Sequence, residues 1–239
     1  MSRFYRGLRN VVQRLCSSPS GKTVLLVQFF LRFLMAKPGE TRQKILNIAQ
    51  DAVLSKGFAA TSIDEIVAAA EVTRSGFFYY FKDKNALARA LLERYVESED
   101  ALFDELFDRS RELHEDPLHA MLIGLKLLSE MMGDLPSAHP GCLVATTCYQ
   151  DQLFDGQVRE VVHESFSSWR KRFAGYFREI GDLYPPRETV DYDELGDMVN
   201  CVVEGGLILS RAYDDPSVLA GQIMHLRRYV KFLFAPVQH

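Results

Sequence analysis

The sequence predicts an all-α protein, and three observations support this fold class. Apolar residues beyond Gly39 recur at helical spacing in one segment after another. Helix-capping and helix-ending signals separate these segments. No run shows the apolar–polar alternation of a half-buried strand. We therefore expect several short helices near the N-terminus, followed by a larger region of longer helices.

The short helices are defined by their caps. The first is expected over residues 41–56 and ends at Gly57, which suits the left-handed position after a helix. Ser62 and Glu65 have the spacing of a capping box and open a helix of about two turns. Thr73 caps an equally short third helix, and Asp83 caps a fourth.

The longer helices are separated by proline, glycine and aspartate. Pro117 and Pro216 each follow an aspartate, which fits a cap followed by a first helical residue. Helices are predicted over residues 117–133, 141–152, 156–180, 191–213 and 216–234. This pattern predicts a small domain over 40–84 and a larger helical domain over 85–239.

Composition limits the choice of partners. The 239 residues carry a formal charge of −4, but residues 1–35 contain six basic residues and no acid. The remainder therefore holds 22 basic against 32 acidic residues, and a polyanion must be met by a local basic patch. The four cysteines lack the spacing of a disulfide framework, which favours a reducing cytoplasm.

The three short helices, with a tight turn at residues 70–72, predict a helix-turn-helix, whose second helix enters the DNA major groove by its N-terminal end. That end, formed by Thr73, Arg74, Ser75 and Gly76, is small and polar. Gly76 removes a side chain where the backbone approaches DNA. Among the aromatic residues that follow, Phe78 and Phe81 are expected to point inward, whereas Tyr79 and Tyr80 can donate to phosphates. Lys84 adds a positive charge.

Residues 41–87 resemble the DNA-binding domain of the TetR family of bacterial regulators. The resemblance rests on Gly57-Phe58, Thr61-Ser62-Ile63, Ser75-Gly76, Tyr79-x-Phe81 and Lys84. It implies an all-helical homodimer that binds a palindromic operator and releases it when a small molecule enters the C-terminal domain. It also implies phosphate contacts from Thr61, Ser75, Tyr79, Tyr80 and Lys84, and base-facing positions at Arg74 and Gly76.

One residue departs from the family pattern. Glu71 stands where the family usually has glycine. If the backbone is left-handed there, a side chain costs about 1 kcal/mol. An acidic side chain close to phosphates would also weaken binding to DNA.

The C-terminal region is similar in a less specific way. Residues 201–233 resemble the last two helices of many TetR-type regulators, which pack as a four-helix bundle across the dimer. The interface residues expected there are Gly205, Gly206, Leu209, Leu226 and Tyr229. The candidate effector pocket comprises Phe103, Phe107, Met121, Cys142, Tyr149, Phe166 and Trp169. These side chains favour an apolar or amphipathic effector, although the same pattern fits a solid core.

The residues before Met35 leave three alternatives open. The apolar stretch 24–35 is interrupted by Gln28 and Arg32 and is too short to span a membrane. The first alternative is that residues 1–34 are translated upstream sequence and that Met35 is the start. The second is a basic arm that contacts phosphates. The third is a weak membrane-associating segment. We favour the first, and we expect residues 1–35 to lie outside the core with no stable membrane association.

Other functions have weaker support. No catalytic motif is present, so no catalytic residue and no cofactor is predicted. His139, Cys142, Cys148 and His163 match no compact zinc spacing, and no metal is expected from them. Cys142 and Cys148 could sense oxidants, although buried structural thiols are commoner. The rival hypothesis is a helical enzyme or a membrane-attached adaptor that does not bind DNA.

Overall fold

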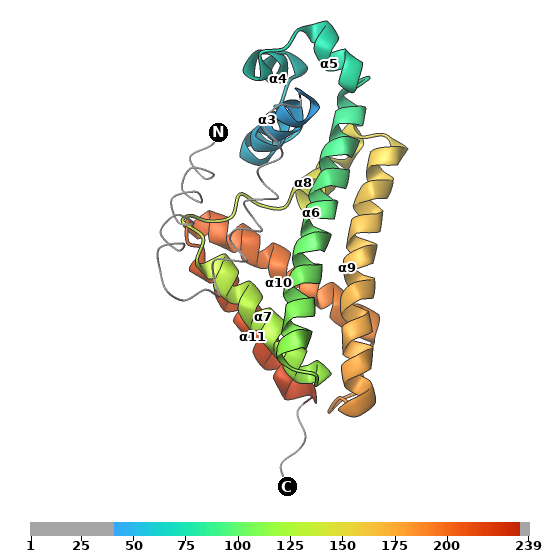
Figure 1. Ribbon diagram of the computed structural model, residues 1–239, viewed down its shortest axis with the longest axis vertical. Coiled ribbons are helices and arrows are strands. Elements are labelled where there is room, and N and C mark those ends of the chain that lie inside the picture. The colour runs from blue at the N-terminus through green and yellow to red at the C-terminus, as the bar shows by residue number, and fades with distance from the viewer. Residues whose placement is uncertain (1–40, 235–239) are drawn as a thin grey trace. The chain divides into compact units, whose positions relative to one another are not determined.

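The computed structural model describes residues 41–234, and the expectations for residues 1–35 lie outside this range. Within it every regular element is helical, which confirms the all-α prediction (Figure 1). In chain order the elements are α3 (Thr41–Lys56), α4 (Ile63–Ala70), α5 (Arg74–Tyr80), α6 (Lys84–Leu113), α7 (Pro117–Gly133), α8 (Leu143–Cys148), the 3-10 turn η1 (Asp151–Leu153), α9 (Gly156–Leu183), α10 (Tyr192–Tyr213) and α11 (Ser217–Phe234).

The chain forms two compact units. The first contains the described residues up to Glu99 together with Pro140–His163, and the second contains Asp100–His139 together with the residues from Glu164 onward. Helices α6 and α9 therefore each contribute residues to both units. The first unit also includes α8 and η1, which come from a stretch far along the sequence.

In the first unit, α3 packs against both α4 and α8. Phe58, which follows α3, is buried and meets Phe154 edge-to-face with ring centroids 4.9 Å apart. The side chain of Gln150 accepts a hydrogen bond from the Ala59 N–H at 3.2 Å. Gly57 has a φ of +83°, which confirms the predicted left-handed end of α3. These contacts fix the turn from which the next two helices start.

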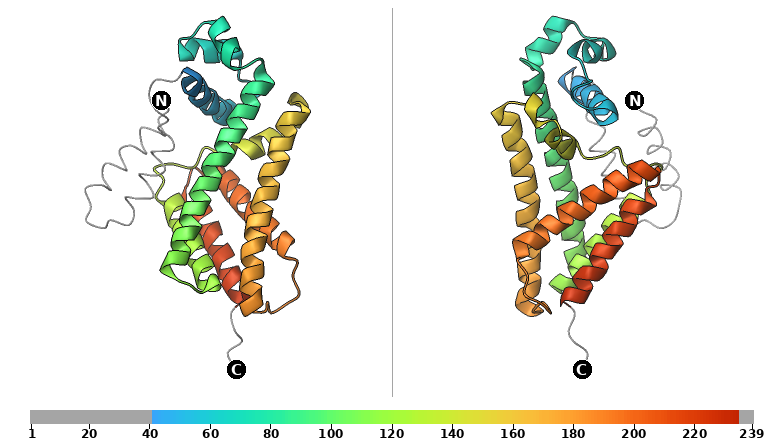
Figure 2. Two further views of the ribbon diagram at one scale, coloured as in Figure 1. Left: turned by 45° about the vertical axis from the view of Figure 1, so that its right-hand side comes forward. Right: turned by 180° about the vertical axis from the view of Figure 1, so that it is seen from behind.

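In the second unit, α7 and α11 lie side by side, and α10 packs against α11 (Figure 2). The Ser129 hydroxyl on α7 donates to the Ala220 carbonyl at 2.9 Å. The Arg227 guanidinium on α11 donates back to the Leu122 carbonyl at 2.8 Å. Two long helices are thus joined by polar contacts as well as by their buried faces.

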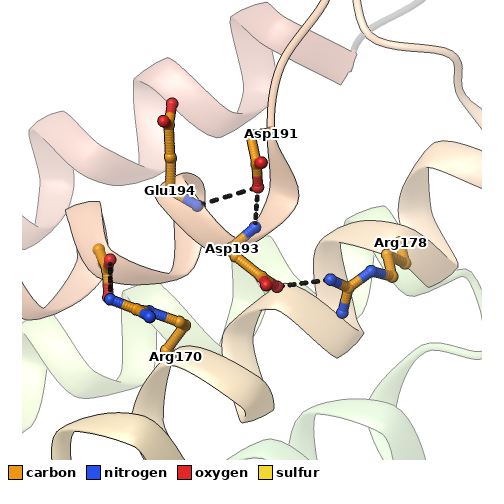
Figure 3. Close-up of polar contacts among 6 residues, drawn as sticks. Arg170, Arg178, Asp191, Asp193 and Glu194 are labelled. Carbon is orange, nitrogen blue, oxygen red and sulfur yellow. Dashed lines mark hydrogen bonds and ion pairs between the residues drawn. The ribbon is translucent and has the colours of Figure 1, made fainter.

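Ion pairs fasten α10 to the part of α9 that belongs to the second unit (Figure 3). Arg170 is bidentate to Asp197, at 2.7 and 2.6 Å, and Arg178 pairs with Asp193 at 2.5 Å. Asp191 caps α10 by accepting from the N–H groups of Asp193 and Glu194 (Figure 3). A Cβ at Gly196 would lie 2.6 Å from the Arg170 carbonyl oxygen, so only glycine permits this close approach of the two helices.

Candidate nucleic-acid interface

Helices α4 and α5 are joined by a turn of three residues, which confirms the predicted helix-turn-helix. The Ser62 hydroxyl caps α4 by accepting from the Glu65 N–H at 3.2 Å. The Thr73 hydroxyl caps α5 by accepting from the Gly76 N–H at 3.0 Å. Between them, Glu71 has a φ of 56° and a ψ of 40°. The left-handed conformation considered for this position is therefore present, on a residue other than glycine.

The turn is closed by backbone hydrogen bonds at the end of α4. The Glu71 N–H donates to the Ala68 carbonyl, and the Val72 N–H donates to the Val67 carbonyl, each at 3.2 Å. The left-handed conformation of Glu71 directs the following N–H, that of Val72, back to the Val67 carbonyl. The Glu71 carboxylate reaches the Lys44 ammonium on α3 at 3.0 Å. Because both side chains are largely exposed, this pair contributes little to stability.

Two phenylalanines set the orientation of α5. Phe77 and Phe81 are 0% and 1% exposed, and their ring centroids lie 5.6 Å apart. The Phe81 N–H donates to the Phe77 carbonyl at 3.0 Å, so helical bonding continues to Phe81. Phe78 is 40% exposed. The expectation that Phe78 points inward is therefore wrong, because the buried pair is spaced four residues apart rather than three.

The opposite face of α5 is open to solvent. Tyr79 is 83% exposed and Tyr80 is 38% exposed, with their rings edge-to-face at 5.0 Å. Thr73, Arg74 and Ser75 are also exposed at the start of the helix. The Thr73 and Ser75 hydroxyl oxygens lie 3.1 Å apart. A short helix thus presents hydroxyls, a guanidinium and two phenols to solvent.

Gly76 lies beside the cap of α5. A Cβ there would lie 3.1 Å from the Thr73 hydroxyl oxygen, which is the atom that caps α5. The equivalent position of α4 holds Glu65 beside the Ser62 cap, so this cap does not by itself require glycine. The close approach of the backbone to DNA at Gly76 stays a prediction.

Arg74 has an acidic partner within the motif. Its Nη1 lies 2.9 Å from the Asp64 carboxylate in the first turn of α4. The two side chains are 66% and 71% exposed, so water competes for both. Sequence reasoning did not single out Asp64, because the charge pattern alone does not show that residues 64 and 74 meet. On the same helix Glu65 pairs with Lys56, and this hydrogen bond lowers the pKa of Glu65.

Thr61 and Lys84 have internal partners. Thr61 is buried, and its hydroxyl donates to the Gly57 carbonyl at 2.9 Å. The Lys84 ammonium donates to the Phe58 carbonyl at 2.6 Å and lies over the Phe58 ring. Burial lowers the pKa of Lys84. Both side chains hold the turn after α3 in this conformation. The Thr61 hydroxyl has one proton and would have to leave the Gly57 carbonyl to donate to a phosphate, whereas the Lys84 ammonium has three donors and can bind a phosphate while it keeps the Phe58 carbonyl.

A second surface of interest lies on α10 and α11. Large apolar side chains are exposed at Ile208, Leu209, Tyr213, Tyr229 and Phe232. A Cβ at Gly205 would meet open space, whereas a Cβ at Gly206 would lie 2.6 Å from Leu219 of α11. Leu226 is only 3% exposed. Of the five predicted interface residues, Gly205, Leu209 and Tyr229 thus face outward, and Gly206 and Leu226 pack within the chain.

Four of the candidate pocket residues are buried in the core of the second unit, namely Phe103, Phe107, Met121 and Trp169. Phe103 meets Trp169 edge-to-face at 4.5 Å, Phe107 meets Phe173 at 5.6 Å, and Met121 is also buried. Phe166 is half-buried. A small hollow with room for about one water molecule is lined in part by Phe107, Met121 and Tyr176.

Cys142 and Tyr149 belong to the first unit, so the structure does not place them in this cluster. The Cys142 thiol is buried and caps α8, accepting from the Ala145 N–H at 3.4 Å. Tyr149 is 78% exposed. Within residues 41–234, no helix combines the length and apolar character needed to cross a membrane.

Comparisons with known proteins agree with this geometry. Residues 45–91 match the family described as bacterial regulatory proteins, tetR family, and residues 126–222 match the transcriptional regulator LmrA/YxaF-like C-terminal domain. The chain is 25% identical over 185 residues to the uncharacterized HTH-type transcriptional regulator YxaF of Bacillus subtilis, covering 77% of this chain and 92% of that protein. It is 25% identical over 176 residues to the HTH-type transcriptional regulator LmrA of the same organism, covering 72% and 87%.

A solved structure shows the same fold. The regulatory protein TetR from Rhodobacter sphaeroides superposes with a TM-score of 0.61 at 23% identity, covering 78% of this chain and 97% of that one. At this identity the likeness shows the fold alone.

The left-handed Glu71 generates a prediction about stability. Glu71→Gly should raise the free energy of unfolding by about 0.5–1 kcal/mol, since relief of the backbone cost exceeds the loss of an exposed ion pair. Glu71→Gln should give no such gain, because it removes the charge and keeps the side chain. Urea unfolding measures both.

Asp214→Gly is the matched control for this prediction. Asp214 ends α10 with a φ of 52° and a ψ of 40°, in the same left-handed region. Asp214→Gly should raise the free energy of unfolding by less than Glu71→Gly does, since aspartate tolerates the left-handed region better than glutamate. A Glu71→Gly chain that unfolds at lower urea than the parent would show that the Lys44 pair outweighs the backbone cost.

Proposed function

Because the chain belongs to the TetR family and is a DNA-binding transcriptional regulator, we propose that it acts in the cytoplasm as a homodimeric repressor that reads a palindromic operator through α5. It is a regulator and not an enzyme. The observation that carries the proposal is the orientation of α5. Burial of Phe77 and Phe81 leaves Arg74, Ser75 and Tyr79 exposed on one short helix.

Each exposed group has a chemical role in this proposal. The Arg74 guanidinium offers the paired donors that recognise O6 and N7 of guanine in the major groove. The hydroxyls of Thr73, Ser75, Tyr79 and Tyr80 donate to phosphates and fix the register of the protein on the duplex. Gly76 lets the backbone come close.

The energies favour transfer of Arg74 from Asp64 to DNA. An exposed ion pair is worth about 0.2–1 kcal/mol. A good bidentate contact to guanine provides about 1–3 kcal/mol of discrimination. The Arg74–Asp64 ion pair is therefore weak in the free protein, and Arg74 leaves Asp64 when it can bind a guanine instead. The negative charge of Asp64 then disfavours non-specific binding to DNA phosphates.

Release by an effector rests on the aromatic core of the second unit. Phe103, Phe107, Trp169 and Phe173 form a connected cluster with apolar faces. The space beside the cluster is small, so a ligand must displace side chains to enter it. Helix α6 begins at Lys84 and carries Phe103 and Phe107 further along the same helix. A change in the cluster can thus bias the position of the residues that begin α6.

The exposed apolar face of α10 and α11 supports the homodimer. Ile208 and Phe232 are 55% and 61% exposed, and Leu209, Tyr213 and Tyr229 are also exposed on these two helices. A group of exposed apolar side chains can mark an interaction surface. In a dimer the same face of each chain would be buried. We place Ile208, Leu209 and Tyr229 in this interface, with Gly205 at the closest approach.

Substitutions should separate base contacts from phosphate contacts. With an operator selected from random duplexes, Arg74→Ala should weaken operator binding by 1–3 kcal/mol and random DNA much less. Lys84→Ala should weaken binding to both DNAs alike and lower the salt slope by about one, because it removes one phosphate contact. Fluorescence anisotropy over a range of salt concentrations measures both.

Lys82→Ala removes an exposed cation two residues before Lys84 and is the matched control. Equal losses on operator and random DNA for Arg74→Ala and Lys84→Ala would show that these roles are wrongly assigned. A Lys84→Ala chain that loses stability without a change in salt slope would assign Lys84 to the turn after α3 alone.

A single substitution tests whether this face forms the dimer interface. Ile208→Arg places a charge in the proposed interface and should convert the dimer to a monomer, because a buried unpaired charge costs several kcal/mol. Light scattering after size exclusion gives the mass. Leu113→Arg, at an exposed leucine outside α10 and α11, should remain dimeric. A dimeric Ile208→Arg chain would place the interface elsewhere.

Effector-linked release is tested by thermal shift with a library of apolar and amphipathic compounds, repeated with operator DNA. A true inducer should stabilise the free protein and lower operator affinity, because the two ligands favour different states. Compounds that stabilise the protein and leave operator affinity unchanged would contradict release.

A further inference from the structure

A cluster of two histidines and one aspartate lies in the second unit, where α6 ends and α7 begins. His114, Asp116 and His119 have the spacing H-x-D-x-x-H. One ligand-type atom from each residue lies within 4.8 Å of the other two. The interpretation of the sequence did not include these residues, because its metal candidates were His139, Cys142, Cys148 and His163.

Asp116 is held in place from three directions. Its carboxylate caps α7 by accepting from the His119 N–H at 2.8 Å. The same oxygen lies 2.7 Å from the His119 ring Nδ1. The Tyr184 hydroxyl, just beyond α9, donates to the other carboxylate oxygen. A carboxylate that is fixed by a second partner resembles the supported ligands of metal sites.

The two imidazoles are already close to each other. Their ring centroids lie 4.6 Å apart with nearly parallel planes, and the His114 Nδ1 accepts from the Asp116 N–H at 3.2 Å. Ligand atoms bound to one ion at about 2.0–2.2 Å lie roughly 3–3.5 Å apart. Coordination thus requires the His114 ring to leave the stack by rotation about the Cα–Cβ bond. Its exposed side chain has room for this rotation.

The donor atoms select the class of ion. Two imidazole nitrogens and one carboxylate oxygen suit zinc, nickel, cobalt or copper, whereas magnesium and calcium prefer oxygen ligands. Because the side chains of His114 and His119 are exposed, water can complete the coordination.

We propose that His114, Asp116 and His119 form a surface site for a divalent transition-metal ion, with Tyr184 as the positioning residue for Asp116. Binding joins the end of α6, the start of α7 and the residue after α9 within the second unit. It stabilises that unit by mass action, since the unfolded chain does not bring the three ligands together. The site is independent of the proposed DNA-binding role.

Zinc titration tests the proposal on the full, untagged chain. After treatment with chelator and desalting, calorimetry should show one zinc ion per chain, and cobalt should show visible absorption bands of a nitrogen–oxygen site. His114→Gln and His119→Gln should each weaken zinc binding at least tenfold. Tyr184→Phe should weaken it 10–100-fold, although it removes no ligand. Asp116 is left intact because it caps α7.

Controls exclude other binding sites. His225→Gln removes an exposed histidine on α11 and should leave zinc affinity unchanged. Urea unfolding in chelator should show that the three variants keep the fold of the parent without metal. Absence of binding at micromolar zinc would overturn the site. Zinc binding that survives both His114→Gln and His119→Gln would also overturn it, and would point to the exposed thiols of Cys148 and Cys201.

Discussion

Burial of Phe77 and Phe81 is the constraint on which the proposed DNA-binding surface depends. Because these rings are spaced four residues apart and fully buried, they fix the rotation of α5 about its axis. Removing a buried phenylalanine typically costs about 3–5 kcal/mol, so this rotation is strongly specified. It places Arg74, Ser75 and Tyr79 on the solvent side of a helix of only seven residues. Five consecutive aromatics are therefore divided between a core and an exposed face.

The motif also contains features that oppose tight binding. The left-handed backbone at Glu71 lowers the stability of the fold, and the Glu71 carboxylate places a negative charge beside the turn. Asp64 holds Arg74 by an exposed pair that a guanine can displace and that water weakens. Both acids are expected to reduce attraction to DNA in general, whereas in the proposed complex a guanine would replace Asp64 as the partner of Arg74. The proposed arrangement would favour discrimination between sequences over total affinity.

Local signals allowed much of the fold to be predicted. Caps at Ser62 and Thr73 and the end at Gly57 were confirmed, because each depends on residues close in sequence. The segment 141–152 was expected as one helix, but it divides into α8 and η1, where Gln150 turns back to bond Ala59. That bond joins residues 91 apart, and periodicity does not show it.

The sequence supplied candidate site residues, which stay a prediction, but it did not show their contacts within the chain. Phe78 was placed inward, since a three-residue spacing also fits a helix, and only packing against the core selects Phe77. The internal partners of Thr61 and Lys84 lie on the turn after α3, and the ion pair of Arg74 reaches across to α4. Gly206 and Leu226 fit the periodicity of an interface but meet neighbours within the chain.

Protection of guanine N7 from methylation by dimethyl sulfate, on a selected operator, tests the central claim most directly, because N7 lies in the major groove. Protected guanines should occur in two inverted half-sites, one helical turn or a multiple of it apart, and Arg74→Ala should abolish that protection. Protein that binds the operator and leaves every N7 reactive, or that protects the same guanines without Arg74, would contradict recognition of bases through α5.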